Sequence, residues 1–312
     1  MRSGRTGSDP MGAFDIPGVE GKHGYAARES VVLKKRVLLP LATILLAPVL
    51  FVLLKTPTHQ GPWKPEYRLM ASSIQKQDIV TIDNFRRARY GPDGTPREVQ
   101  WERRSVDLSE LESVWYGISI FREPALAHTF LSFDFGDGDP VVVSVEARQR
   151  PDQAYGPVKG LLNAFHLIYV MADERDVIVV RTHLRGERVL FQPLTIDPAT
   201  RQELFQELLA RANSLQREPE FYNTLTSNCT NSLLRDVEFP VWRRYLDPRV
   251  LMAGLSDRVA YEFDVIDTRY ALARLREVAR LDPETFSIDD PAMSLQIRNV
   301  YFARLEQSVK HR

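Results

Sequence analysis

Cysteine is nearly absent from the sequence. Only Cys229 occurs among 312 residues, so the chain can form no internal disulfide and has no Cys-x-x-Cys metal or redox motif. Glycine is also sparse, with 16 residues and no glycine-rich phosphate-binding loop. Basic and acidic residues number 41 each, which argues against a nucleic-acid-binding protein. The whole chain is 44% hydrophobic, enough for one sizeable core or two small ones.

One long apolar run is present. Residues 37–54 are 18 consecutive uncharged, mostly apolar residues between Arg36 and Lys55. At a rise of roughly 1.5 Å per residue, this length crosses a bilayer core of about 30 Å. Two prolines weaken the helical pattern, and a buried core helix is the alternative, but a soluble helix of this length would normally show a polar face. The sequence therefore predicts one transmembrane helix.

The charges before this run predict its orientation. Residues 1–36 carry seven Lys or Arg against four Asp or Glu, with three consecutive basic residues, 34–36, next to the apolar run. By the positive-inside rule the N-terminus stays in the cytoplasm and the rest is exported. No cleavage site is evident, so we expect a single-pass anchor in the inner (cytoplasmic) membrane. The predicted parts are a disordered cytoplasmic tail (1–33), the anchor (34–55), a linker (56–65) and a periplasmic or extracytoplasmic domain (66–312).

The exported part has the pattern of an α+β domain. Its first half alternates apolar and polar residues and is divided by turn sequences, which is typical of antiparallel strands and hairpins. A helix over residues 200–216 opens with the capping-box pair Thr200 and Glu203. A second helix is expected to begin near Cys229, and the chain past Pro240 reads as mostly helical, including 267–281, before polar turns at its end. The strands are expected within 78–91, 97–106, 114–121, 128–135, 141–147, 165–173 and 175–184.

The position of Cys229 allows two interpretations. An unpaired cysteine in an exported protein is either inert in the core or retained for its chemistry. The sequence "TSNCTN", residues 226–231, places the sulfur at the expected start of a helix. Unpaired N–H groups and the helix dipole favour a thiolate there, and the same N–H groups can stabilise an oxyanion.

A thiol nucleophile needs a base, and histidine is the usual one. The folded region offers His128, His166 and His183. His128 stands at the start of a strand, whereas the other two lie within strand-like runs. Each histidine by itself is more often an ordinary side chain than a catalyst, and spacing alone does not choose among them.

Four segments together carry a family resemblance: "AHTFLSFDF", "VSVEARQR", "LIYVMADERDVIVVRTHLRGE" and "EFYNTLTSNCTNSLL", in this order. They resemble the periplasmic domain of Lnb-type lipoprotein N-acyltransferases, a family similar to permuted papain-like (NlpC-like) thiol enzymes. The resemblance covers about residues 75–300. It implies a permuted papain-like fold in which a histidine opening a strand precedes an "NC" turn that begins a later helix. His128 and Cys229 match that order.

Period-two alternation places Ser144, Glu146 and Arg148 on one face of the strand after the His128 strand. If the hairpin turns near Asp137, Glu146 lies almost opposite His128 and can orient its ring. An exposed strand glutamate is the alternative. The aspartates of "DFGDGD" are explained by a tight hairpin turn, so neither a metal nor a cofactor is predicted. Further positions expected to bind substrate or shape the site are Asn228, Arg148, Arg175, Asp176 and Tyr155.

These features predict a membrane-anchored cysteine acyltransferase that works through a thioester. The resemblance implies a phospholipid as acyl donor and the N-terminal amine of a lipoprotein as acceptor. An NlpC-like cell-wall peptidase or amidase is the first alternative, and a non-catalytic envelope scaffold is the second. An aliphatic pocket favours the lipid substrate, whereas a polar open groove favours the peptide.

The predicted topology is testable by protease accessibility. Protease added to spheroplasts is expected to digest exposed loops of the domain 66–312 and to spare a tag at residue 1, because the basic cluster retains the N-terminus in the cytoplasm. A protected C-terminal domain would mean the opposite orientation.

Overall fold

The computed structural model describes residues 40, 47, 50, 52, 54–121, 123, 126–224 and 247–310, with side chains up to residue 307. The chain divides into two units, residues 1–55 and 56–312, and the second contains the hydrophobic core. Among the described residues, no helix combines the length and the hydropathy needed to cross a membrane. Most of the apolar run 37–54 lies outside those residues, so the anchor stays a prediction.

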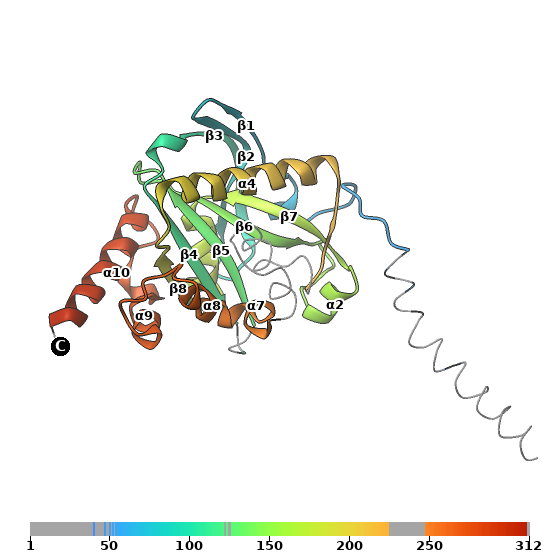
Figure 1. Cartoon of the computed structure of the whole chain (residues 1–312). Helices are drawn as coiled ribbons and strands as arrows, with labels where there is room; N and C mark the ends of the chain where they lie inside the picture. The colour runs from blue at the N-terminus through green and yellow to red at the C-terminus, as the bar shows by residue number, and fades with distance from the viewer. Residues whose placement is uncertain are drawn as a thin grey trace, which may run out of the picture. The chain divides into compact units, whose positions relative to one another are not determined.

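One mixed sheet forms the centre of the second unit (Figure 1). Its neighbours run in the order β1-β2-β7-β6-β5-β4-β8-β10, while β3 pairs with β2 and β9 pairs with β7. Every pairing is antiparallel except that of β2 with β7. The strands are β1 (Ser72–Lys76), β2 (Ile79–Tyr90), β3 (Pro96–Asp107), β4 (Ser113–Ile120), β5 (Ala127–Asp134), β6 (Val141–Arg148), β7 (Phe165–Ala172), β8 (Arg188–Pro193), β9 (Phe221–Tyr222) and β10 (Arg280–Leu281).

Several helices pack around this sheet, which confirms the predicted α+β class with a large, mostly antiparallel sheet. The α-helices are α2 (Pro157–Leu161), α3 (Glu174–Val179), α4 (Pro198–Arg217), α7 (Pro248–Leu251), α8 (Ser256–Glu262), α9 (Leu272–Val278) and α10 (Met293–Lys310). A π-helical turn, η3 (Val180–Leu184), continues α3. Short 3₁₀ turns are η1 (Pro65–Tyr67), η2 (Leu108–Glu110), η4 (Ala253–Leu255) and η5 (Pro283–Thr285).

The two faces of β5 have different neighbours, because successive side chains of a strand point to opposite faces. On one face α4 lies across the sheet (Figure 1), and Phe205 of α4 packs against Phe133 with ring centroids 4.7 Å apart. On the other face Ser132 donates to Glu174 of α3, and the guanidinium of Arg181 in η3 lies 5.5 Å from the Phe130 ring centroid. The α3–η3 segment therefore covers the face that also carries His128.

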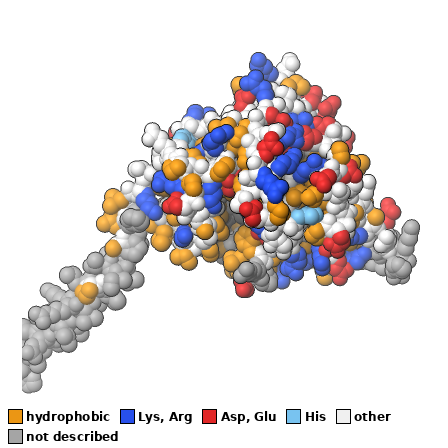
Figure 2. Space-filling model, turned by 180° about the vertical axis from the view of Figure 1, so that it is seen from behind, with side chains coloured by type: hydrophobic (Ala, Val, Ile, Leu, Met, Phe, Trp, Pro, Cys, Tyr) orange, Lys and Arg blue, Asp and Glu red, His pale blue; other side chains and the backbone are white. Residues whose placement is uncertain are grey.

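Charged side chains of both signs are spread over the surface of the domain. Figure 2 shows basic and acidic side chains of both signs interspersed on the face seen from behind, in keeping with the balanced composition. The "DFGDGD" turn between β5 and β6 contributes to this pattern, because Asp137 and Asp139 pair with Arg104, and Asp139 also with Arg87. Mixed charge of this kind limits self-association at sheet edges.

The strand expected over residues 175–184 is wrong, because this segment forms α3 and η3. A short apolar run rich in β-branched residues is typical of a buried strand, but periodicity cannot distinguish such a strand from a fully buried helix. The deciding signal is local: Asp173 is the N-cap and its side chain accepts from the backbone N–H of Asp176.

Other elements differ from the sequence expectations at their ends. The long helix α4 begins two residues before Thr200, and its cap is Asp197, whose carboxylate accepts from two backbone N–H groups. Strand β8 was not predicted. The helix expected over residues 267–281 is shorter, since α9 ends at Val278 and β10 follows. The expected polar turns at the C-terminus are instead the helix α10.

A substitution at Gly117 in β4 tests how tightly the sheet is packed. A Cβ atom at this position would lie 2.2 Å from Cζ of Phe130 on the neighbouring strand, so Gly117→Ala is expected to destabilise the domain by about 1–3 kcal/mol. Thermal unfolding measures this as a lower midpoint. The double variant with Phe130→Leu should lose less than the sum of the two single variants, because the shorter side chain relieves the clash. A wild-type midpoint for Gly117→Ala would contradict the packing.

Candidate functional site

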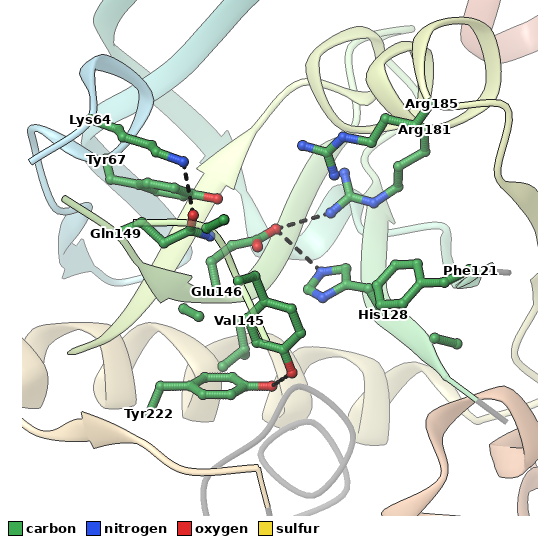
Figure 3. A pocket seen from close by; sticks show the side chains of 14 residues that line it. Lys64, Tyr67, Phe121, His128, Val145, Glu146, Gln149, Arg181, Arg185 and Tyr222 are labelled. Carbon is green, nitrogen blue, oxygen red and sulfur yellow. Dashed lines mark hydrogen bonds and ion pairs between the residues drawn. The ribbon is translucent and has the colours of Figure 1, made fainter. Parts of the chain in front are cut away.

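Two neighbouring strands bring His128 and Glu146 together. Strands β5 and β6 pair antiparallel with Phe130 opposite Ser144, and the same register continued by two residues sets His128 opposite Glu146. Both side chains project from the face covered by α3 and η3. His128 Nε2 lies 3.3 Å from Glu146 Oε1 (Figure 3). The sheet register thus positions an imidazole and a carboxylate side by side.

Ser144 completes this contact. Its Oγ lies 2.7 Å from His128 Nε2 and donates to Glu146 Oε1, also at 2.7 Å. Because the serine proton goes to the carboxylate, the Ser144 oxygen accepts from an N–H at Nε2. The neutral imidazole then carries its lone pair on Nδ1. Nδ1 points away from Glu146 (Figure 3), so it is the nitrogen suited to accept a proton from another group.

A cation from the helical segment joins Glu146 from the other side. Arg181 Nη2 lies 3.0 Å from Glu146 Oε1, and Arg181 Nη1 donates to the carbonyl of Val177 at 2.7 Å. Arg181 belongs to the π-helical turn η3, a geometry found frequently at functional sites. One oxygen of Glu146 therefore interacts with an imidazole, a hydroxyl and a guanidinium.

The charges around Glu146 keep its carboxyl group ionised. Burial acts to raise its pKa, but the nearby charge and hydrogen bond of His128, the charge of Arg181 and the hydrogen bond of Ser144 together hold the pKa well below its ordinary value. An ionised carboxylate orients the histidine ring and stabilises an imidazolium. The arrangement can thus support a histidine that accepts and returns a proton.

The pair opens onto a pocket of about 290 Å³. Its lining is mixed rather than aliphatic, with aromatic rings, small apolar side chains and several cations. Lys64 Nζ donates to Gln149 at 2.8 Å, and the hydroxyl groups of Tyr155 and Tyr222 lie 3.4 Å apart (Figure 3). The described residues that line it are Lys64, Tyr67, Phe121, Ala127, His128, Val145, Glu146, Ala147, Gln149, Ala154, Tyr155, Arg181, Arg185 and Tyr222.

Comparison with known families identifies the family of this chain. A family model described as the Lnb N-terminal periplasmic domain matches residues 97–271, more than half of the chain. The chain belongs to this Lnb family. The resemblance found in the sequence is therefore confirmed, and a periplasmic location is indicated for the domain. No curated protein and no solved structure gives a significant match.

The Lnb match has informative limits. It begins in β3 and ends just before α9, so it includes His128, Glu146, Arg181 and Cys229. Lys64, which lines the same pocket, precedes the matched region. The pocket is thus formed mainly by the Lnb region and closed on one side by the segment that follows the predicted anchor.

Two of the predicted site residues, Cys229 and Asn228, lie outside the described residues, as does the helix expected to begin there. Their roles stay predictions. On the described side, β9 ends at Tyr222, which lines the pocket, and Thr224 donates to the carbonyl of Pro157. The described segment 126–224 therefore ends close to the pocket wall, at a residue that precedes Cys229 by five positions.

Three other predicted residues, Arg148, Arg175 and Asp176, are not among the residues that line the pocket. Arg148 shares a strand face with Glu146, but it donates to the carbonyls of Tyr67 and Arg68, and burial lowers its pKa to about 10. Arg175 donates to the carbonyl of Asp290.

Asp176 is fully buried and pairs with Arg86 through both carboxylate oxygens. It fixes the start of α3 against β2, and so acts on the site only through the position of the segment that carries Arg181. Tyr155, by contrast, lies in the pocket wall as predicted.

Sequence reasoning missed Arg181, Arg185 and Lys64. Arg181 was assigned to a strand, but helical spacing of four residues separates it from Val177, whose carbonyl it contacts, and it interrupts an otherwise apolar run. A charged residue within an apolar run was the sequence feature that could have identified Arg181 as a site residue. No such feature marks Lys64 or Arg185, because a linker lysine and a loop arginine are common on any protein surface.

The low pKa of Glu146 predicts a pH-dependent contribution to stability. A carboxyl group whose folded pKa lies below its unfolded value stabilises the fold above the unfolded pKa, and this contribution is lost as pH falls through the folded pKa. The unfolding free energies of wild type and Glu146→Gln should therefore stay apart from pH 7 down to about 5 and converge only as pH falls further, below the ordinary glutamate pKa of about 4.3. Glu110→Gln, at an exposed glutamate, is the control and should keep a constant difference. A constant difference for Glu146→Gln as well would contradict the assignment.

Proposed function

We propose that this protein is a membrane-anchored thiol acyltransferase in which Cys229 is the nucleophile and His128 is the base. The observation that carries the proposal is the His128 imidazole held by Ser144 and Glu146 at the wall of a pocket, within a chain of the Lnb family. The order of histidine strand and later cysteine turn supports a permuted papain-like active site. Glu146 is the orienting residue, and Arg181 positions Glu146.

The reaction proceeds in two balanced steps. First, the Cys229 thiol gives its proton to His128, and the sulfur attacks the carbonyl carbon of an acyl ester. The ester C–O bond breaks, the leaving alcohol takes the proton from the imidazolium, and an acyl thioester remains. Second, an amine attacks the thioester carbon, His128 removes a proton from the nitrogen, and the C–S bond breaks. The products are an amide and the thiol, which regains that proton.

The membrane setting supports a lipid as donor. We propose that residues 34–55 hold the protein in the inner membrane with the N-terminus in the cytoplasm, so that the periplasmic domain works beside the bilayer. A phospholipid then supplies the acyl group, and the N-terminal amine of a lipoprotein accepts it. Both substrates are confined to the same surface, which raises their effective concentration at the pocket.

Hydrolysis of a cell-wall peptide through a thioester on the same cysteine is the second candidate. The peptide amide then replaces the ester, so an amine leaves in the first step and takes the proton from the imidazolium. The polar part of the pocket lining, including Gln149 and the cations Lys64 and Arg185, favours it, because such groups also suit a cell-wall peptide. In this version water replaces the amine in the second step. The two versions share Cys229 and His128, and differ in the product.

Intact-protein mass spectrometry tests the proposal. Full-length protein incubated with phospholipid is expected to gain the mass of one fatty acyl group on Cys229, and the adduct should disappear when a lipoprotein-like N-terminal diacylglyceryl-cysteine peptide is added. Acylated peptide as product indicates transfer, whereas free fatty acid indicates hydrolysis.

The variants serve as controls for the adduct. Cys229→Ala should give no adduct, and His128→Ala should lower its rate by roughly 10²–10⁴-fold, the usual contribution of a general base. Combining both should cost no more than Cys229→Ala alone, because nucleophile and base act as a unit. A wild-type rate of adduct formation in His128→Ala would refute the thiol–imidazole mechanism.

A further inference from the structure

An exposed apolar patch lies on the short segment around α2. Among the described residues from Thr56 onward, nine large hydrophobic side chains are exposed, and four of them lie within the eight residues 155–162. These four are Tyr155 (40% exposed), Val158 (66%), Leu161 (39%) and Leu162 (40%). Single exposed apolar residues are common on soluble proteins, but such a local cluster marks an interaction surface. We call residues 155–162 the apolar segment.

The apolar segment borders the pocket of the candidate site. Tyr155 lines this pocket, stacks on Phe165 with ring centroids 5.6 Å apart, and shares a hydroxyl contact with Tyr222 (Figure 3). Its neighbours Val158 and Leu161 belong to α2, which projects from the domain at the start of β7 (Figure 1). The patch is therefore placed at the rim of the pocket and not on a remote surface.

The beginning of the domain is fixed beside the same pocket. The Trp63 ring packs against His166 and lies under the guanidinium of Arg148, and its Nε1 donates to the carbonyl of His59. Lys64 lines the pocket itself. The domain's attachment point and the apolar segment thus both border the pocket.

This attachment leaves little free chain between the predicted anchor and the domain. From Lys55, where the predicted anchor ends, four residue steps lead to His59, and they extend no more than about 14 Å. A domain of this size is several times wider, with a radius of gyration of roughly 18 Å. An anchor that ends at Lys55 would keep the attachment point within this short chain length of the membrane surface.

Charge around the apolar segment suits a bilayer surface. Lys159 and Arg150 are exposed and Lys64 is partly exposed, while Asp152 is the acidic residue in this stretch. Hydrophobic and basic side chains lie together on the side of the domain that carries α2 (Figure 2). Apolar residues flanked by basic residues are typical of elements that insert into the headgroup region.

We propose that the apolar segment docks into the interface of the bilayer in which the chain is anchored, and seats the rim of the pocket on the lipid. The boundary between headgroups and acyl chains then surrounds Val158, Leu161 and Leu162. Tyr155 lies between this membrane-inserted part and the pocket. The inference rests on the anchor of the proposed function but not on its chemistry. A lipid ester can then reach His128 without crossing water.

A fluorescent label reports docking directly. In full-length protein with Cys229→Ser, an environment-sensitive dye is attached at Val158→Cys, and the protein is placed in phospholipid nanodiscs. The expected result is a blue-shifted emission that lipids carrying a quencher in the upper acyl chain reduce. The matched control is Ile74→Cys on the β1–β2 hairpin, which is 60% exposed and lies away from α2. The dye at position 74 should show the emission of a water-exposed probe, and the lipid quencher should not reduce it.

Two results would overturn the docking. A dye at position 158 that behaves as the dye at position 74 means that the segment stays in water. A dye that is shielded from water but not reached by the lipid quencher means that protein covers the segment.

Activity separates docking from catalysis. Val158→Asp with Leu162→Asp is expected to lower acyl transfer from vesicle phospholipid about tenfold, and to leave the rate with a short-chain, water-soluble ester unchanged. Ile74→Asp should change neither rate. Equal losses on both substrates would argue against docking. Quenching at position 158, together with no turnover of either ester by the protein that retains Cys229, would refute the proposed function and leave the docking intact.

Discussion

Buried ion pairs fix the α3–η3 segment on the sheet, and the geometry of the candidate site depends on these ion pairs. Asp176 pairs with Arg86 of β2, and Glu174 pairs with Arg298 of α10 while accepting from Ser132 of β5. A buried carboxylate is tolerated only when cations and hydrogen bonds replace its hydration. These two carboxylates therefore define where the first turns of the segment lie, and the next turns deliver Arg181 to Glu146.

Glu146 repeats the same principle at the site itself. Its carboxylate is desolvated, yet His128, Ser144 and Arg181 supply the compensating charge and hydrogen bonds. This arrangement has two consequences for the histidine. The Nε2 proton is engaged, which leaves the lone pair on Nδ1, and the nearby negative charge favours an imidazolium once the ring has accepted a proton. The structural pairs at Asp176 and Glu174 and the candidate site thus use the same chemistry, and the pocket beside Glu146 distinguishes the candidate site from those pairs.

The pocket of the candidate site lies beside the segment that follows the predicted anchor. Trp63 and Lys64, which follow the predicted anchor, and Tyr155, which begins the apolar segment, all lie beside it. The proposed lipid donor fits this placement, because a short attachment to the predicted anchor would keep the pocket near the bilayer. The proposed docking and the proposed chemistry are therefore compatible, although each is tested independently.

The sequence by itself determined the family, the α+β class and the neighbourhood of His128 and Glu146. Those conclusions rest on local signals: ordered motifs, strand alternation with period two, and a hairpin turn that sets the register of adjacent strands. The single cysteine and the apolar run also come from the sequence, and they remain predictions because they lie largely outside the described residues.

Only the tertiary structure decided the remainder of the site. Whether the run after Asp173 is a strand or a helix depends on what buries it, and a β-branched run buried on all sides carries no periodic signal. The helical result turns Arg181 toward Glu146 and leaves Asp176 with Arg86. Lys64 and Tyr155 meet at one pocket although 90 intervening residues separate them, and no local pattern encodes a contact between segments so far apart in the chain.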